Sequence, residues 1–212
     1  MGTIKQGILG GFSGKVGTVI GSSWKGIAYM RGQAQSIKNP KTEGQTNQRN
    51  KFTLVLAFLQ SIMSFIKVGY KSHAQKQSAF NAAMSYILKN AVTGTAPDYA
   101  INYANVLVSR GSLTAPEGAA ALAASGKVTI TWNDNSGSGL AASTDKAMVV
   151  LFDEDKGEAV TTTEGAARNA ETLDQAVPAA WEGDTVHAYI AFIAADGSIV
   201  SDSVYAGSVT AA

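Results

Sequence analysis

The hydrophobic pattern of this chain changes its period near residues 93–97, and that change limits the folds open to it. Upstream, apolar residues in the range 52–66 recur at three- and four-residue spacing, as in a buried helix. Downstream, apolar residues in the range 128–132 alternate with threonines, as in a half-buried strand. Because the two periods occupy separate parts of the chain, and a segment containing Gly and Pro divides them, we predict an α+β protein.

The part after residue 97 is predicted to be a β-sandwich. Short strand candidates follow one another there, with turn signals between many of them, which is typical of a sandwich of immunoglobulin or fibronectin type III kind. Trp132 would be its core tryptophan. The predicted domains are therefore a basic, glycine-rich β arm with a helical hairpin at 1–96, and an acidic β-sandwich at 97–212. The strand candidates are Tyr99–Val108, Val128–Trp132, Met148–Phe152, Ala159–Thr163, Glu171–Leu173, Val186–Ala194 and Ile199–Val209.

A polar segment at residues 39–52 is predicted to begin the first helix, which would span residues 43–68. Thr42 and Gln45 have the spacing of a capping box, in which two side chains bond free backbone N–H groups at a helix N-terminus. The apolar face begins at Phe52, so we expect that ring to pack into the core. The residues assigned to structural roles are Thr42, Gln45, Arg49, Phe52 and the core residue Trp132.

A second helix is predicted to pair with the first. Gly69 is expected to end the first helix, as glycine commonly does at a helix C-terminus. Ser72 and Gln75 form another capping-box pattern, from which a helix would run to about Asn90. The short connection favours an antiparallel helix pair.

Residues 1–38 are rich in glycine and are predicted to form a β-hairpin or arm. Two β-prone pieces, Val16–Ile20 and Trp24–Arg31, could be joined by a turn at residues 21–23. An arm of this size is not stable alone, so we expect it to pack on something. Two different faces are predicted for the second piece: Ile27, Tyr29 and Arg31 on one, and Ala28, Met30 and Gly32 on the other.

The charged residues are divided unevenly along the chain. Residues 1–96 carry twelve basic residues and one acidic residue, a net charge of +11, whereas residues 97–212 carry five basic and fifteen acidic residues, a net charge of −10. Such a split favours two domains and a directional interaction between unlike parts, either within one molecule or head-to-tail between copies of the chain, and self-association of this kind weakens as salt rises. The alternative is that the two surfaces are solvated independently.

No stretch of the sequence has the pattern of a catalytic or cofactor site. The chain has no cysteine. The segment Gly10–Val16 fails the phosphate-loop pattern, because Leu9 stands where the first glycine is required and Val16 replaces the Ser/Thr. The acidic segment Asp153–Glu158 does not fit a calcium loop, and we interpret it as a solvated turn, with a weak cation site as the alternative. His73 and His187 have no partner histidine nearby in sequence. We therefore predict no enzyme activity and no cofactor.

Basic and aromatic residues are interleaved in the first part of the chain, a combination that can bind polyanions through charge and stacking. The alternative is that the aromatic residues pack on the first helix while the lysines are solvated. The residues proposed for polyanion contact are Lys15, Trp24, Lys25, Arg31, Lys38, Lys41, Arg49 and Lys51.

Neither a membrane-spanning segment nor a leader is predicted. The longest apolar segment, residues 52–68, is interrupted by polar residues and is amphipathic. Residues 1–6 lack a charged region followed by an apolar run, so we expect no signal peptide and, by default, a cytoplasmic location.

Several motifs occur together along the chain. They are Gly10–Gly17, Trp24–Gly26, Asn39–Thr42 with Gln45, Gln48, Arg49 and Phe52, Val106–Ser109 with Gly111 and Leu113, Ala167-Arg168, Trp181–Asp184, and Ser201–Ser203 with Tyr205. Their joint spacing resembles the DUF6266 family of uncharacterised proteins from Bacteroidetes, over nearly the whole chain. The 39–52 core is also similar to a motif in short phage-type hypothetical proteins, over about residues 10–70. The resemblance implies no activity and no catalytic residues.

We expect a non-enzymatic structural or interaction protein, such as a phage-derived assembly or adhesion component. Its partner would be another copy of the chain or a different protein. The alternatives are binding of nucleic acid or another polyanion by the basic half, and carbohydrate binding by the sandwich. The aromatic candidates for carbohydrate binding are Tyr103, Tyr189 and Trp181.

Overall fold

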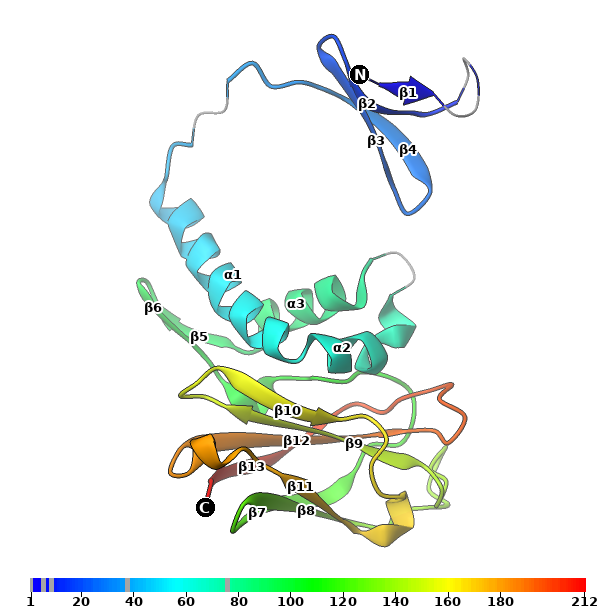
Figure 1. Ribbon diagram of the computed structural model, residues 1–212, viewed down its shortest axis with the longest axis vertical. Coiled ribbons are helices and arrows are strands. Elements are labelled where there is room, and N and C mark those ends of the chain that lie inside the picture. Colours follow the sequence, from blue (N-terminus) through cyan, green and yellow to red (C-terminus); the bar gives the residue numbers. More distant parts are fainter. Residues whose placement is uncertain (1, 5–6, 8–9, 37–38, 75–76) are drawn as a thin grey trace. The chain divides into compact units, whose positions relative to one another are not determined.

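The computed structural model describes residues 2–4, 7, 10–36, 39–74 and 77–212 (Figure 1). The chain forms two compact units, Met1–Thr42 and Glu43–Ala212. We call the first the N-terminal sheet and the second the body. The boundary lies upstream of the change of hydrophobic period at residues 93–97, because helices and strands of the body share one hydrophobic core.

Two helices replace the single helix predicted over residues 43–68. Helix α1 spans Glu43–Ser61 and α2 spans Met63–Gly69, with an angle of 87° between them. The break falls at Ile62, whose side chain is fully buried, so both helices can pack against the core. No single helix in the described ranges is long and apolar enough to cross a membrane, and the bent pair α1 and α2 reaches that length and composition only when its members are combined.

The start of α1 agrees with the predicted motif, but the position of Phe52 does not. The helix begins at Glu43, which leaves Thr42 at the residue before it. Phe52 is 45% exposed, so the expectation of a buried ring is wrong. The reason is that α1 extends through its first turns before it reaches the core, and Val55 is its first buried residue.

Gly69 has a different role from the predicted helix stop. It is the last residue of α2, and an added Cβ would lie 2.7 Å from the carbonyl oxygen of Val108. Such a distance is too short for a Cβ contact, so glycine is required here by the close approach of another backbone segment. Close packing against this segment, and not helix capping, is therefore the reason for glycine at position 69.

The second predicted capping box is also wrong. Ser72 lies in a 3₁₀ turn, Lys71–His73, and its hydroxyl donates to the Arg110 carbonyl at 3.2 Å. Gln75 lies outside the described residues. Helix α3 begins later and spans Ala79–Asn90, with the Ser78 hydroxyl accepting a hydrogen bond from the Asn81 backbone N–H at 3.1 Å.

Replacing Ser78 with alanine is expected to lower the free energy of unfolding by ~1 kcal/mol, because the α3 N-terminus loses its cap. Urea denaturation of the full chain measures the change. Ser85→Ala is the matched control, since Ser85 is exposed within the same helix, where alanine is the better helix former. Equal stability of the two variants would show that the Ser78 cap contributes nothing.

The chain is a mixed α+β protein, as predicted. Its body contains two antiparallel sheets, in agreement with the many strands predicted for the C-terminal part. One sheet has the order β10-β9-β12-β13 and the other the order β11-β8-β7. No α-helix occurs in the described residues between 120 and 212, where the helical elements are 3₁₀ turns of three residues each. The strands are β7 (Glu117–Ala124), β8 (Lys127–Asn133), β9 (Lys146–Asp153), β10 (Glu158–Thr162), β11 (Thr172–Ala176), β12 (Thr185–Ile193) and β13 (Val204–Thr210).

Two predicted strands are too long, and one strand was not predicted. The candidate Ile199–Val209 is a strand only from Val204, where β13 begins. The candidate Tyr99–Val108 is a strand only at its start, because β6 spans Asp98–Ile101 and a 3₁₀ turn follows at Tyr103–Asn105. Strand β6 pairs with β5 (Val92–Thr95) as a separate hairpin. Strand β7 was not predicted, because its alanine-rich sequence lacks the β-branched and aromatic residues that signal a strand.

Strand β9 lies between two hydrophobic cores, and its side chains alternate between them. Met148, Val150 and Phe152 belong to the core that also contains the apolar faces of the helices. Val149 and Leu151 belong to the core that also contains residues of the other sheet. Helices α1, α2 and α3 thus cover one face of the β10-β9-β12-β13 sheet (Figure 1), while the β11-β8-β7 sheet supplies residues to the core on the other face.

The predicted position of Trp132 in the core is confirmed. It is 3% exposed, and its indole N–H donates to the Arg168 carbonyl at 2.7 Å. The ring also packs edge-on against Phe192 of β12, with 5.7 Å between the ring centroids. The tryptophan therefore joins β8 to the opposite sheet.

The N-terminal sheet has four antiparallel strands in the order β1-β2-β3-β4. The predicted turn at residues 21–23 is wrong, because these residues lie inside β3. The connections fall instead at residues 17–18 and 25–26, inside the two predicted β pieces, so neither piece is a single strand. Lys25 and Gly26 both have positive φ, at 48° and 83°, as a two-residue hairpin turn requires. The strands are β1 (Thr3–Ile4), β2 (Phe12–Val16), β3 (Val19–Trp24) and β4 (Ile27–Gly32).

Candidate functional site

The register of the N-terminal sheet places Lys15, Arg31 and two of its aromatic residues, Trp24 and Tyr29, on one face. Directly paired residues of neighbouring strands point to the same side of a sheet. Trp24 pairs with Ile27, and two residues further along Ser22 pairs with Tyr29. Ile20 pairs with Arg31 on the same side. It also pairs with Lys15, so this face extends onto β2. We call this side the basic face; it carries Lys15, Ile20, Ser22, Trp24, Ile27, Tyr29 and Arg31.

The side chains of the basic face are accessible. Trp24 is 56% exposed and Tyr29 is 46% exposed, and the two basic residues Lys15 and Arg31 are also exposed. The predicted alternation of the β4 strand is therefore confirmed, since its odd-numbered residues lie together on this face. The alternative that these aromatic residues pack on the first helix would need a contact with the other unit, and it stays a prediction.

The opposite side of the N-terminal sheet, which we call the apolar face, carries no charged residue among its described strand positions. Val16 pairs with Val19, and Met30 pairs with Gly21 on the same side. The Phe12 ring lies where a side chain at Gly21 would point, so glycine is needed there. Val16 and Met30 are 54% and 71% exposed, which leaves apolar surface open on this face.

The eight residues proposed for polyanion contact belong to both units of the chain. Lys15, Trp24 and Arg31 share the basic face, and Lys25 lies in the turn between β3 and β4. Lys38 lies outside the described residues. Lys41 precedes α1 at the end of the N-terminal unit, whereas Arg49 and Lys51 belong to α1 in the body, where the Lys51 ammonium lies 4.7 Å from the centre of the Tyr99 ring.

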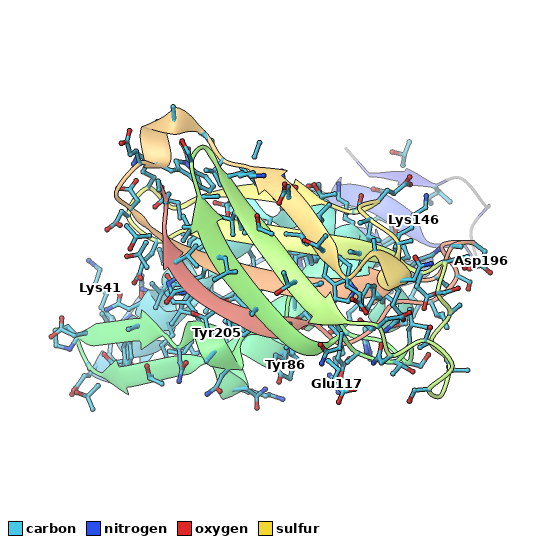
Figure 2. All side chains as sticks on the ribbon, turned by 90° about the horizontal axis from the view of Figure 1, so that it is seen from below. Lys41, Tyr86, Glu117, Lys146, Asp196 and Tyr205 are labelled. Atoms are coloured by element: carbon cyan, nitrogen blue, oxygen red, sulfur yellow. The ribbon has the colours of Figure 1, made fainter. Side chains whose placement is uncertain are left out.

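Sequence reasoning missed a hydrogen-bonded cluster around His187. Its Nδ1 lies 2.9 Å from the Tyr205 hydroxyl, and its Nε2 lies 3.1 Å from a carboxylate oxygen of Glu154. The imidazole also stacks on the Tyr103 ring at a centroid distance of 3.9 Å. Tyr205 is labelled in Figure 2. No sequence signal could have found this cluster, because three of its members come from segments far apart in the chain.

The His187 cluster has the chemistry of a structural contact. Both ring nitrogens have hydrogen-bonding partners and one ring face is covered, so the imidazole has no free nitrogen to offer a ligand. Burial raises the pKa of the Tyr103 hydroxyl to about 12, and the Glu154 carboxylate adds to that shift. The phenol is therefore neutral at pH 7. The cluster links β12 and β13 to the turn at Tyr103–Asn105 that follows β6.

The acidic segment at residues 153–158 is a tight turn between β9 and β10. One oxygen of Asp153 accepts hydrogen bonds from the backbone N–H groups of Asp155 and Lys156, at 2.9 and 3.1 Å. The Lys156 ammonium lies 3.8 Å from the other oxygen of Asp153 and pairs with Asp184. A lysine of the chain thus supplies the positive charge, and the part of the chain that the structure describes contains no group of three or more His, Cys, Asp or Glu residues that could hold a metal ion.

Two of the three aromatic candidates for carbohydrate binding are buried. Trp181 and Tyr189 both belong to the largest fully buried side chains of the body. Tyr103 is half-buried beneath His187. These residues cannot form an exposed aromatic platform, and their assignment to a carbohydrate surface is corrected.

A shallow cleft in the body was also missed. Its lining includes Tyr70, His73, Tyr86, Lys89 and Arg110, with no acidic side chain among the described residues that line it. The Arg110 guanidinium lies 5.6 Å from the centre of the Tyr86 ring. The spacing of Tyr86 and Lys89 on α3 was visible in the sequence, but only tertiary contact brings Arg110 to them.

Comparison with known proteins adds a family but no activity. No curated protein matches the chain. A family model described as a family of unknown function, DUF6266, matches residues 11–207. That match covers the strands of the basic face and nearly all of the body, and the chain therefore belongs to the DUF6266 family.

Proposed function

We propose that this protein is a non-enzymatic interaction protein, an assembly or adhesion component whose N-terminal sheet binds another copy of the chain. The observation that carries the proposal is the exposed apolar face, where Val16, Val19 and Met30 stand in solvent. A sheet this small gains little stability from its own core. Covering the apolar face in an assembly would remove that surface from water and stabilise the sheet.

The charges of the two units support another copy as the partner. Residues 1–42 contain six basic residues and no acidic residue, whereas residues 43–212 contain eleven basic and sixteen acidic residues. The net charges are therefore +6 for the N-terminal unit and −5 for the body. Attraction between unlike units of two molecules favours a head-to-tail contact, which repeats into rings or filaments.

The body fits the role of a scaffold in this proposal. We infer that its two sheets form a sandwich of the fibronectin type III kind. The support is the division of strands, in which β10 pairs with β9 while β11 joins β8 and β7. In an immunoglobulin constant domain the fourth strand, the counterpart of β10, would instead lie in the sheet of the first, second and fifth strands. Those three strands are the counterparts of β7, β8 and β11. Sandwiches of this kind are common in cell-surface proteins.

Light scattering of the full chain is expected to give an average mass above the 21.9 kDa of one chain, rising with protein concentration. The mass should fall as salt is added, because exposed charge pairs are screened. The double variant Val16→Thr/Met30→Thr should shift the protein toward the monomer, since it replaces apolar surface on the apolar face.

The matched control is Leu122→Thr/Leu140→Thr, which removes two exposed apolar side chains from the body. This control should assemble like the unmodified chain. A wild-type protein that stays monomeric at every concentration and salt would refute the proposal. Equal loss of assembly in both double variants would place the contact outside the apolar face.

A further inference from the structure

We infer that the basic face of the N-terminal sheet binds single-stranded nucleic acid, with Trp24 and Tyr29 stacking on bases and Lys15 and Arg31 contacting phosphates. This inference goes beyond the proposed assembly, because it uses the opposite face of the sheet. The two faces have different chemistry: one carries cations with Trp24 and Tyr29, and the other carries apolar side chains and no charge at its described strand positions. The apolar contact of the assembly and the nucleic-acid contact therefore use opposite faces of the sheet.

The charge of the N-terminal unit identifies a polyanion as the occupant of the basic face. Residues 1–42 contain no carboxylate side chain, so no group of this unit repels a phosphate chain. Lys15 and Arg31 both flank Ile20, which pairs with each of them, so the two cations lie together at one end of the face. Basic groups in such an arrangement bind phosphates through electrostatic attraction and release of counterions.

The aromatic residues select single strands. Trp24 and Tyr29 are diagonal neighbours on β3 and β4, because Trp24 pairs with Ile27 and Ser22 pairs with Tyr29. Residues in such a diagonal pair are about 7–8 Å apart, so that their aromatic side chains can reach one another. Exposed aromatic rings on a sheet stack on unpaired bases, whereas the bases of a duplex are already stacked on each other.

The tryptophans of this chain give a direct readout of the stacking. The sequence contains three tryptophans, of which Trp24 is 56% exposed while Trp132 and Trp181 are buried in the body. A base stacked on Trp24 should quench its emission and protect it from a soluble quencher such as iodide. The other two indoles should not respond, so the change reports on the basic face.

The experiment measures binding of a labelled twelve-residue oligothymidylate to the full chain by fluorescence anisotropy, with tryptophan emission recorded in parallel. Trp24→Ala is expected to weaken binding about 5- to 150-fold, the range found for loss of one stacked base. Trp24→Phe should keep most of the affinity, because phenylalanine still stacks, but should abolish the quenching signal.

The charge contacts are tested by salt dependence. Lys15→Gln/Arg31→Gln should reduce the slope of log affinity against log salt by about 0.7 for each phosphate that the variant no longer neutralises. The matched control is Lys89→Gln/Arg110→Gln, which removes the same charge from the cleft of the body. If this control loses binding while the basic-face variant keeps it, the inference is wrong and the cleft is the anion site.

Two further measurements separate bases from charge and nucleic acid from assembly. Heparin carries negative charge without bases, so it should compete for the cations yet leave Trp24 emission unquenched. Equal binding of heparin and oligothymidylate, with no effect of Trp24→Ala, would overturn the inference. The assembly-defective Val16→Thr/Met30→Thr variant should still bind oligothymidylate, so failure of the proposed assembly would not be mistaken for failure of this inference.

Discussion

Replacing Arg168 with methionine is expected to lower the free energy of unfolding of the body by about 3–5 kcal/mol. Arg168 and Asp145 form an ion pair in which both side chains are almost fully buried. Removing one member leaves the other as an uncompensated charge in the interior, which is costlier than the pair itself. Burial lowers the pKa of the Arg168 guanidinium, and the Asp145 carboxylate opposes that shift.

The surroundings of Arg168 explain why one residue has so large an expected effect. Its guanidinium donates to Asp145 Oδ2 through Nε and Nη2 at 3.2 and 3.1 Å, and to the Thr114 carbonyl at 3.0 Å. The Asn135 side chain accepts a further hydrogen bond from Nη1. The guanidinium also lies over the Phe192 ring, 3.8 Å from its centre. The segment before β7 and the loop after β8 are thereby held to the sheet that contains β12.

Chemical denaturation measures the Arg168 effect against an exposed ion pair as control. Lys127→Met removes one member of the Lys127–Asp174 pair, whose side chains are about half exposed, and should cost no more than about 1 kcal/mol. The double variant Arg168→Met/Asp145→Asn should recover part of the lost stability, since it leaves no unpaired buried charge. Equal costs for Arg168→Met and Lys127→Met would contradict the structural assignment.

Replacing Phe58 with alanine is expected to cost about 3–5 kcal/mol, because the side chain fills the core between the helices and the sheet. Phe58 is 3% exposed on α1, and its ring packs edge-on against Phe152 of β9 with 4.8 Å between centroids. A second contact joins it to the Tyr103 ring at 6.2 Å. Deleting the ring leaves a cavity where two layers of the body meet.

Phe52→Ala is the matched control on the same helix. Its ring is nearly half exposed, so the loss should be about 1 kcal/mol. Circular dichroism follows the helices, and emission of Trp132 and Trp181 follows the sheets when Trp24→Phe is the background. The two signals should change together in one transition, because the helices and strands share a core. Separate transitions would show that the helices and the sheets unfold independently.

Local patterns in the sequence were sufficient for the elements whose environment is simple. The alternation in residues 27–32 predicted the two faces of β4, and residues 128–132 predicted β8 with Trp132 in the core. The helix start after Thr42 agrees as well. In each case the side-chain period and the terminal residues are properties of neighbours in sequence, so no tertiary information is needed.

The candidate site was only partly within reach of the sequence. The mixture of basic and aromatic residues in the first part of the chain was visible, but its members could not be sorted into one surface. Arg49 and Lys51 belong to α1, whereas Lys15 and Arg31 share a sheet face because both pair with Ile20. Strand register is a contact between distant residues, and composition does not specify it.

The sequence by itself determined where the chain favours helix, where it favours strand, and that its charge is divided by sign. The tertiary structure decided which apolar residues are buried: Phe52 is exposed because α1 reaches the core only at Val55. It also decided that Ser78 caps α3 in place of Ser72, and that His187 meets Glu154 and Tyr205. The physical reason is that propensity and period act between near neighbours, whereas burial and pairing depend on which distant segments come together to exclude water.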